Sequence, residues 1–132
     1  MKTLTSREDI AELVHSFYAK VRTDEMLRPV FNTHIAEEEW PAHLSKLTDF
    51  WEMKLLGGAK FKGSPSQKHI DVDRASGYAL SQEHFARWLQ LWLETLDESY
   101  TGPKAERAKA QARKMATGQY ISIWQNRPEN KT

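Results

Sequence analysis

Apolar residues recur at the spacing of an α-helix along most of this chain, and this periodicity limits the fold more than any other feature. Ser6 and Asp9 have the spacing of a capping box, which predicts that the first helix begins there and ends near Arg22 or Thr23. One apolar face then continues over three turns through Ile10, Leu13, Val14, Phe17, Tyr18 and Val21. No segment shows the strict alternation of a strand, so the sequence predicts an all-α fold.

Three further segments have the same periodicity. A helix over about 37–56 is expected to end at Gly57-Gly58, because glycine readily adopts the left-handed conformation that terminates helices. A third helix is expected to begin at about Ser81, and a fourth to run from Pro103 to about Trp124. The inner faces of these helices carry, in chain order, Trp40, His43, Leu44, Leu47, Phe50 and Trp51, then Phe85, Trp88, Leu89, Trp92 and Leu96, then Ala105, Ala108, Ala112, Met115, Gln119 and Ile123.

The connections between these helices differ in length. Residues 29–32 predict a turn that anchors one aromatic ring. Residues 57–81 show no clear period apart from a short helix expected at about 66–70, and a connection this long in a small protein often holds a ligand.

The 132 residues are expected to form one domain, 1–132, with about 1–5 and 126–132 frayed.

Composition excludes several classes of protein. Lys plus Arg number 19 against 18 Asp plus Glu, a balance that argues against a nucleic-acid partner. Cysteine is absent, which excludes disulfides, zinc–thiolate sites and thiol nucleophiles and fits a cytoplasmic location. No apolar run is long enough to span a membrane, and no secretory signal is visible. The nucleotide-binding and hydrolase motifs GxGxxG, Walker A and GxSxG do not occur.

Histidine is the residue type best able to carry chemistry here. The chain has five histidines, and any one taken alone is more often structural or exposed than functional. His43 shares a face with Leu47 and Phe50, and His69 follows a proline at the start of a short helix inside the long connection. His84 is the other histidine near this region. A carboxylate-bridged di-iron site needs paired Glu-x-x-His motifs, and only one, at Glu12, is present.

Aromatic residues supply the second set of candidates. Tyr18 and Trp88 point inward on their helices, where the O–H and N–H groups need acceptors or a ligand. A hydrogen bond to the backbone would satisfy either group equally well. Periodicity leaves open whether the remaining apolar candidates line a cavity or fill a core, namely Phe31, Leu47, Phe50, Trp51 and Phe61.

Several short motifs keep one order over roughly residues 10–120. They are Phe17-Tyr18 with Val21-Arg22, Pro29-x-Phe31-Asn32, Trp40-x-x-His43, Phe50-Trp51, Leu55-Leu56-Gly57, Gly63-x-Pro65-x-x-x-His69 and His84-Phe85-x-Arg87-Trp88-Leu89-x-Leu91-Trp92. Each motif is weak alone, but the ordered set resembles the group III truncated haemoglobins. The stretch between His69 and Trp88 is longer than this family leads us to expect, so the correspondence over 70–80 is not fixed.

This resemblance implies a two-over-two helical sandwich around haem b. By position, His69 matches the axial ligand of the iron, and Tyr18, His43 and Trp88 match the distal ligand-binding side. Residues that match positions near the haem are Phe31, Leu47, Phe50, Trp51 and Phe85. Phe61 is a further candidate for the pocket wall, and the haem propionates would favour a basic neighbour among Lys60, Lys62 and Lys68.

Three functions follow as hypotheses. The first is binding of O2, NO, CO or similar small ligands at a histidine-ligated iron, with donors such as Tyr18 and Trp88 slowing their release. The second is an enzyme that uses the same site for nitric oxide dioxygenation or peroxide reduction and depends on an external reductase. The third is a haem-free helical interaction module, which recovery of a colourless protein that refuses haem would support.

Overall fold

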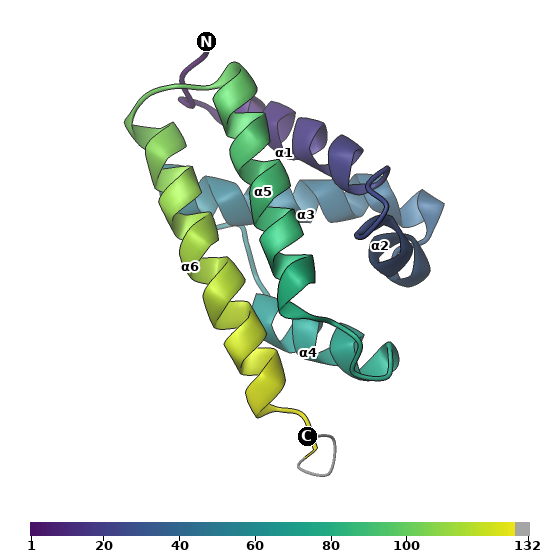
Figure 1. The fold of residues 1–132 in the computed structure, drawn as a ribbon. Coiled ribbons are helices and arrows are strands. Elements are labelled where there is room, and N and C mark those ends of the chain that lie inside the picture. Colours follow the sequence, from purple (N-terminus) through teal and green to yellow (C-terminus); the bar gives the residue numbers. More distant parts are fainter. Residues whose placement is uncertain (129–132) are drawn as a thin grey trace.

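The computed structural model describes residues 1–128, and over this range the chain forms six α-helices and one short 3₁₀ helix. Their bounds are α1 (Arg7–Val21), α2 (Arg28–His34), η1 (Glu37–Glu39), α3 (Trp40–Leu56), α4 (Pro65–Ala75), α5 (Gln82–Ser99) and α6 (Pro103–Gln125). Helix α1 packs against α3 and α5 against α6, and contacts of α1 with α5 and of α3 with α6 join the two pairs. The pairs cross each other, and α4 lies along the lower part of α6 (Figure 1). The all-α prediction is confirmed.

A stack of aromatic rings joins three of the helices. Trp92 of α5 lies parallel to Trp51 of α3 with 4.4 Å between ring centroids, and to Trp88 one turn earlier at 6.2 Å. Phe17 of α1 meets Trp92 edge-on at 4.9 Å. Aromatic pairs in these arrangements contribute about 0.5–1.5 kcal/mol each beyond the area that they bury. The stack therefore fixes α1, α3 and α5 relative to one another.

The predicted helix ends agree with the structure at several places. Ser6 and Asp9 form the capping box of α1. The Asp9 carboxylate accepts from the Ser6 backbone N–H at 3.2 Å, and the Asp9 backbone N–H donates to Ser6 Oγ at 3.3 Å. Gly57 ends α3 in the left-handed region, with φ of +82°. The long helix expected from residue 37 begins as the 3₁₀ turn η1, and regular α-helix follows from Trp40, with a proline in its first turn.

Two of the predicted connections are wrong because they contain more helix than expected. Residues 29–32 belong to α2 rather than to a turn, since buried Asp24 accepts from the N–H groups of Met26 and Leu27 just before it. The short helix expected at about 66–70 is α4, which extends from Pro65 to Ala75. Its cap is Ser64, whose Oγ accepts from the Gln67 N–H at 3.2 Å.

Residues 2, 4 and 127, which belong to the two terminal segments that were expected to fray, make contacts with the rest of the fold. The Lys2 backbone pairs with Ser99 and Thr101 at 2.9 Å each, and Leu4 is buried in the core. Near the other end, the Arg127 side chain pairs with Asp73 of α4. The polar composition of the two terminal segments did not indicate these contacts. Residues 129–132 lie outside the described part of the chain.

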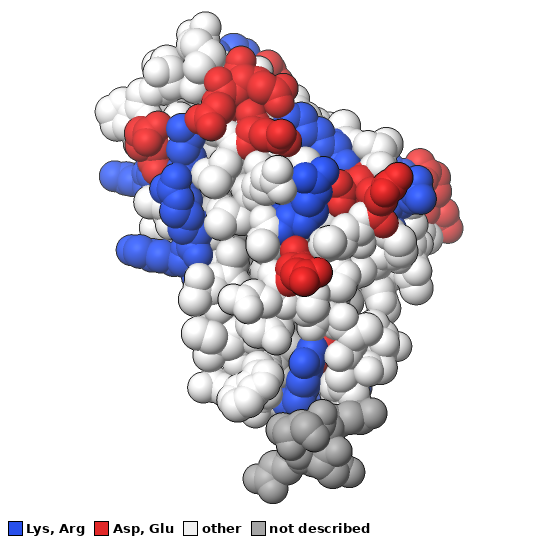
Figure 2. Space-filling model, viewed as in Figure 1, with Lys and Arg blue, Asp and Glu red and all other residues white. Residues whose placement is uncertain are grey.

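Charges of both signs occupy neighbouring positions on the surface. On the face shown in Figure 2, Lys and Arg side chains lie next to Asp and Glu side chains over the upper half. This agrees with the near-neutral balance of the sequence. Within residues 1–128, no helix combines the length and the apolar character needed to cross a membrane.

Two ion pairs are anchored by buried carboxylates. Asp73 accepts from Arg127 Nε at 3.0 Å and from its Nη2 at 2.9 Å, and the same Asp73 accepts from the Leu80 N–H at 3.2 Å. Asp24 accepts from Arg87 Nε at 2.7 Å. Burial works to raise the pKa of Asp24, but the hydrogen bonds from Arg87 and from the Leu27 backbone outweigh it and hold the pKa below its usual value. The Asp73 pair fastens α4 to the end of α6.

We expect Asp73→Ala to lower the free energy of unfolding by about 3–5 kcal/mol, because it leaves the Arg127 guanidinium without its carboxylate in a site that is mostly buried. Urea denaturation followed by circular dichroism measures this change. The matched control is Asp97→Ala, which removes an exposed partner of Lys109 and should cost less than about 1 kcal/mol. Equal effects of the two variants would contradict a clamping role for Asp73.

Candidate functional site

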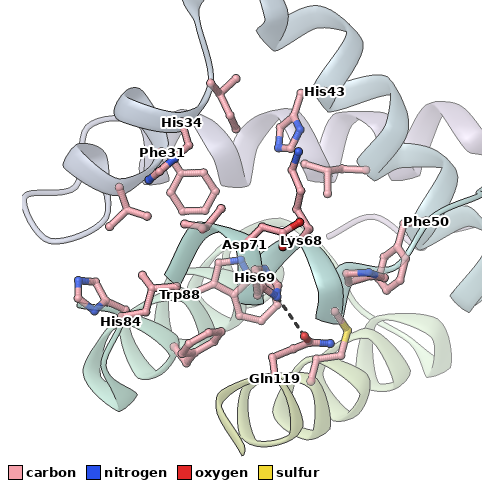
Figure 3. A pocket seen from close by; sticks show the side chains of 18 of the residues that line it. Phe31, His34, His43, Phe50, Lys68, His69, Asp71, His84, Trp88 and Gln119 are labelled. Carbon is pink, nitrogen blue, oxygen red and sulfur yellow. Dashed lines mark hydrogen bonds between the residues drawn. The ribbon is translucent and has the colours of Figure 1, made fainter. Parts of the chain in front are cut away.

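Eleven of the candidate site residues from the sequence line one cavity of about 530 Å³. It lies among α1–α6, and Figure 3 shows it with several of its side chains. The size falls within the range of cavities that bury a small-molecule ligand. The predicted residues found there are Tyr18, Phe31, His43, Leu47, Phe50, Trp51, Phe61, Lys68, His69, Phe85 and Trp88.

His69 enters the cavity from the second turn of α4. Its Nδ1 lies 3.1 Å from Oε1 of Gln119, an amide on α6, and its ring meets Phe85 edge-on at 5.8 Å. Burial lowers the pKa of His69, and the hydrogen bond to Gln119 opposes this only in part. The imidazole is therefore neutral at neutral pH, which is the form that binds a metal ion.

Tyr18 and Trp88 contribute a pair of hydrogen-bond donors from α1 and α5. Tyr18 is 5% exposed. Burial raises the pKa of its hydroxyl to about 12, and a hydrogen-bond interaction with the Trp88 side chain opposes that rise. The hydroxyl thus remains protonated at physiological pH and keeps its ability to donate. Phe17 packs edge-on against both rings, at 4.6 Å and 5.6 Å between centroids, and restricts their movement.

His43 lies at the rim of the cavity, on α3. Its ring meets Tyr18 edge-on at 6.2 Å and Trp40 at 5.3 Å. Burial lowers the pKa of His43, and the positive charges of Lys68 and Lys46 lower it further. Lys68 extends from α4 toward His43 (Figure 3). His43 is therefore a neutral imidazole that can donate or accept one hydrogen bond on either side of its ring.

Apolar side chains form most of the wall. Phe50 packs edge-on against Trp51 at 5.5 Å and against Phe61 at 5.1 Å, and Phe61 comes from the connection between α3 and α4. On the other side, Phe31 of α2 meets Tyr18 at 5.9 Å. The walls thus offer aromatic and aliphatic surface to a flat apolar ligand, with Leu47 and Phe85 completing it.

Sequence reasoning missed several residues that line the cavity. Gln119 and Met115 reach it from α6, and their places on the apolar stripe of that helix were the signal that could have found them. Lys46 lines the cavity together with Lys68, whereas Lys60 and Lys62 do not. His34 and His84 also line the cavity.

His84, the alternative to His69, has a structural partner of its own. Its Nδ1 accepts from the Ser81 backbone N–H at 2.9 Å, across the first turn of α5. This hydrogen bond ties the ring to the start of the helix. The Nδ1 of His69 is instead engaged by a side chain of another helix, Gln119 of α6.

The residues of the cavity suit a haem group. A porphyrin needs apolar walls for its faces, one neutral imidazole for its iron and positive charge near its two carboxylates. The cavity offers aromatic walls, His69, and the ammonium groups of Lys46 and Lys68. Within residues 1–128, no three His, Cys, Asp or Glu side chains gather where they could hold a bare metal ion.

We expect Lys68→Met to raise the pKa of His43, because removal of a neighbouring positive charge makes the imidazolium form less unfavourable. The pKa is measured by following the His43 ring protons by NMR as the pH is lowered through 6.5 in the haem-free protein. Lys62→Met, a change outside the cavity, is the control and should leave the titration unchanged. An unaltered His43 pKa in Lys68→Met would show that the two side chains do not interact.

No family model matches the chain, but two comparisons with individual proteins do. The group 3 truncated haemoglobin ctb of Campylobacter jejuni is 40% identical over 97 residues, which make up 72% of this chain and 72% of that protein. The crystal structure of a group III truncated haemoglobin from Campylobacter jejuni superposes with a TM-score of 0.84 at 32% identity, covering 98% of this chain and 100% of that one. This chain belongs to the group III truncated haemoglobins.

Proposed function

We propose that the protein holds haem b with His69 as the axial ligand and binds O2, NO, CO or a similar small ligand on the opposite face, beside Tyr18, His43 and Trp88. Membership of the truncated haemoglobins implies the haem cofactor. One observation carries the assignment of residues: a neutral imidazole with one ring nitrogen engaged lines the same apolar cavity as the buried hydroxyl and indole.

His69 suits the ligand role because a hydrogen bond to another side chain engages one of its two ring nitrogens. Nδ1 is held by Gln119, so Nε2 is the nitrogen free to bind iron. The iron, once bound, supplies the open coordination position at which diatomic ligands bind. The bond to Gln119 sets the orientation of the imidazole before any ligand arrives.

Tyr18 and Trp88 would stabilise a small ligand by donating hydrogen bonds to it. A diatomic ligand that gains partial negative charge accepts such bonds, and a bond to a charged acceptor contributes about 1.5–3 kcal/mol. Phe17 packs against both donors and Trp92 stacks on Trp88, so little conformational entropy is lost when they bind. His43, neutral and at the rim, would provide a third polar contact.

The remaining predicted residues would hold the porphyrin. Phe31, Leu47, Phe50, Trp51, Phe61 and Phe85 supply apolar surface that excludes water from both faces. Lys68, with Lys46, supplies positive charge for the propionates. The whole chain, 1–132, would serve as one globin domain.

An enzymatic use of the same site is the second candidate, favoured by the same pair of buried donors. Donors fixed in an apolar cavity also stabilise charge that develops when an O–O bond breaks. Nitric oxide dioxygenation or peroxide reduction would then draw electrons from an external reductase. Turnover with added reductase that exceeds the turnover of free haem would establish this activity.

We expect His69→Ala to lose or shift the Soret band that the purified wild-type protein gains when haem is added, because the variant has no imidazole to bind the iron. Absorption titration with haem measures the band, and circular dichroism checks that the helices remain. His84→Ala is the matched control and should keep the wild-type spectrum. The reverse result, with the band lost only in His84→Ala, would transfer the ligand role to His84.

We expect Tyr18→Phe and Trp88→Phe to speed O2 release by about 10- to 100-fold, because each removes one hydrogen bond to a partly negative ligand. Flash photolysis and stopped-flow mixing measure the rate constants. Tyr120→Phe removes a hydroxyl from a residue that does not line the cavity and should leave the rate unchanged. Wild-type release rates in both cavity variants would rule out a role for these donors in ligand binding.

A further inference from the structure

The hydrogen bond between His69 and Gln119 extends the site from α4 to α6. We propose that Gln119 is a positioning residue that holds the proton of His69 on Nδ1, fixes the ring in the cavity, and strengthens Nε2 as a ligand. This inference rests on the proposed function, in which His69 binds the haem iron.

The chemistry of the two atoms determines the direction of this bond. Oε1 of Gln119 only accepts hydrogen bonds, so the Nδ1 of His69, 3.1 Å away, must be the donor. A neutral imidazole carries one ring proton, and placing it on Nδ1 leaves a lone pair on Nε2. Figure 3 shows this bond as the link between the His69 ring and α6.

The position of Gln119 relative to His69 is set by the packing of two helices. The two residues are 50 positions apart in the sequence, and α4 packs along α6. The pair of hydrogen bonds between Asp73 and Arg127 clamps the same two helices near the end of α6. Met115, one turn before Gln119, lines the cavity beside it without a hydrogen-bonding role, so it serves as a matched control.

Because the acceptor of the His69 N–H is a side chain, its strength can be changed by substitution, which is not possible for a backbone carbonyl. The basicity of a ligating imidazole increases with the strength of the acceptor on its other nitrogen. An amide oxygen is weaker in this respect than a carboxylate and stronger than no acceptor at all. A single substitution at position 119 can therefore move the ligand strength of His69 in either direction.

The first experiment uses the haem-free protein and needs no iron. Nitrogen-15 NMR of the His69 ring should show the proton on Nδ1 in the wild type, and Gln119→Met should move much of the population to Nε2. Met115→Leu should keep the wild-type pattern. A wild-type ring with its proton on Nε2 would overturn the proposal, because Gln119 would then act as a donor and Nε2 would have no lone pair for iron.

The second experiment uses the haem-loaded ferrous protein without an added ligand. The iron–histidine stretching frequency in resonance Raman spectra should fall in Gln119→Met and rise in Gln119→Glu, with the wild type between them. Haem transfer to an excess of apomyoglobin should be about tenfold faster from Gln119→Met than from the wild type, at the lower end of the effect of losing such a partner. Thermal unfolding of each variant provides the comparison, since a purely structural role would change stability without producing this order of frequencies.

The outcomes separate this inference from the proposed function. A wild-type spectrum with no iron–histidine band, or with a band that survives His69→Ala, would overturn the proposed ligand. A wild-type band that depends on His69 but has one frequency in all three forms of residue 119 would overturn the role of Gln119 alone. The ordered shift would support both.

Discussion

The stacking of Trp92 between Trp51 and Trp88 is the interaction on which both the core and the cavity depend. Trp92 is completely buried, whereas Trp51 and Trp88 each present part of their surface to the cavity. One side of each of these two rings therefore belongs to the core and another side to the cavity wall. Since interiors are packed at close to crystal density, the cavity cannot collapse by moving these rings without unpacking α1, α3 and α5.

Burial in the cavity shifts the pKa of the tyrosine hydroxyl and the pKa values of two imidazoles in opposite directions. Because an apolar environment disfavours charge, it raises the pKa of Tyr18 and lowers the pKa of His69 and of His43. All three groups are consequently neutral at physiological pH, one as a proton donor and the others with a free nitrogen lone pair. The positive charges of the two lysines that line the cavity lower the pKa of His43 further and reinforce its neutral form. Burial alone thus favours the neutral form of Tyr18, of His69 and of His43.

The resemblance to a known family grouped the cavity residues, because periodicity alone left open whether they line a cavity or fill a core. The four long helices, by contrast, could be predicted from the spacing of apolar residues along single helices. Tyr18 and Trp88 were recognisable as inward-facing residues for this reason. Contacts between distant segments were not predictable in the same way. The length of α4 depends on surroundings that include the pairing of Asp73 with Arg127, 54 positions away, and α2 follows a turn whose N–H groups are bound by buried Asp24. Gln119 was visible as an amide on an apolar stripe, but nothing in its spacing indicated its partner.

The two faces of the cavity belong to different parts of the fold. Tyr18 and His43 come from α1 and α3, which pack together, whereas His69 and Gln119 come from α4 and α6. Helix α4 follows α3 through residues 57–64, and its side chains hydrogen-bond to Gln119 of α6 and to Arg127, just after the end of α6. The hydrogen bond between His69 and Gln119 and the hydroxyl of Tyr18 therefore belong to different helices and can be altered by separate substitutions.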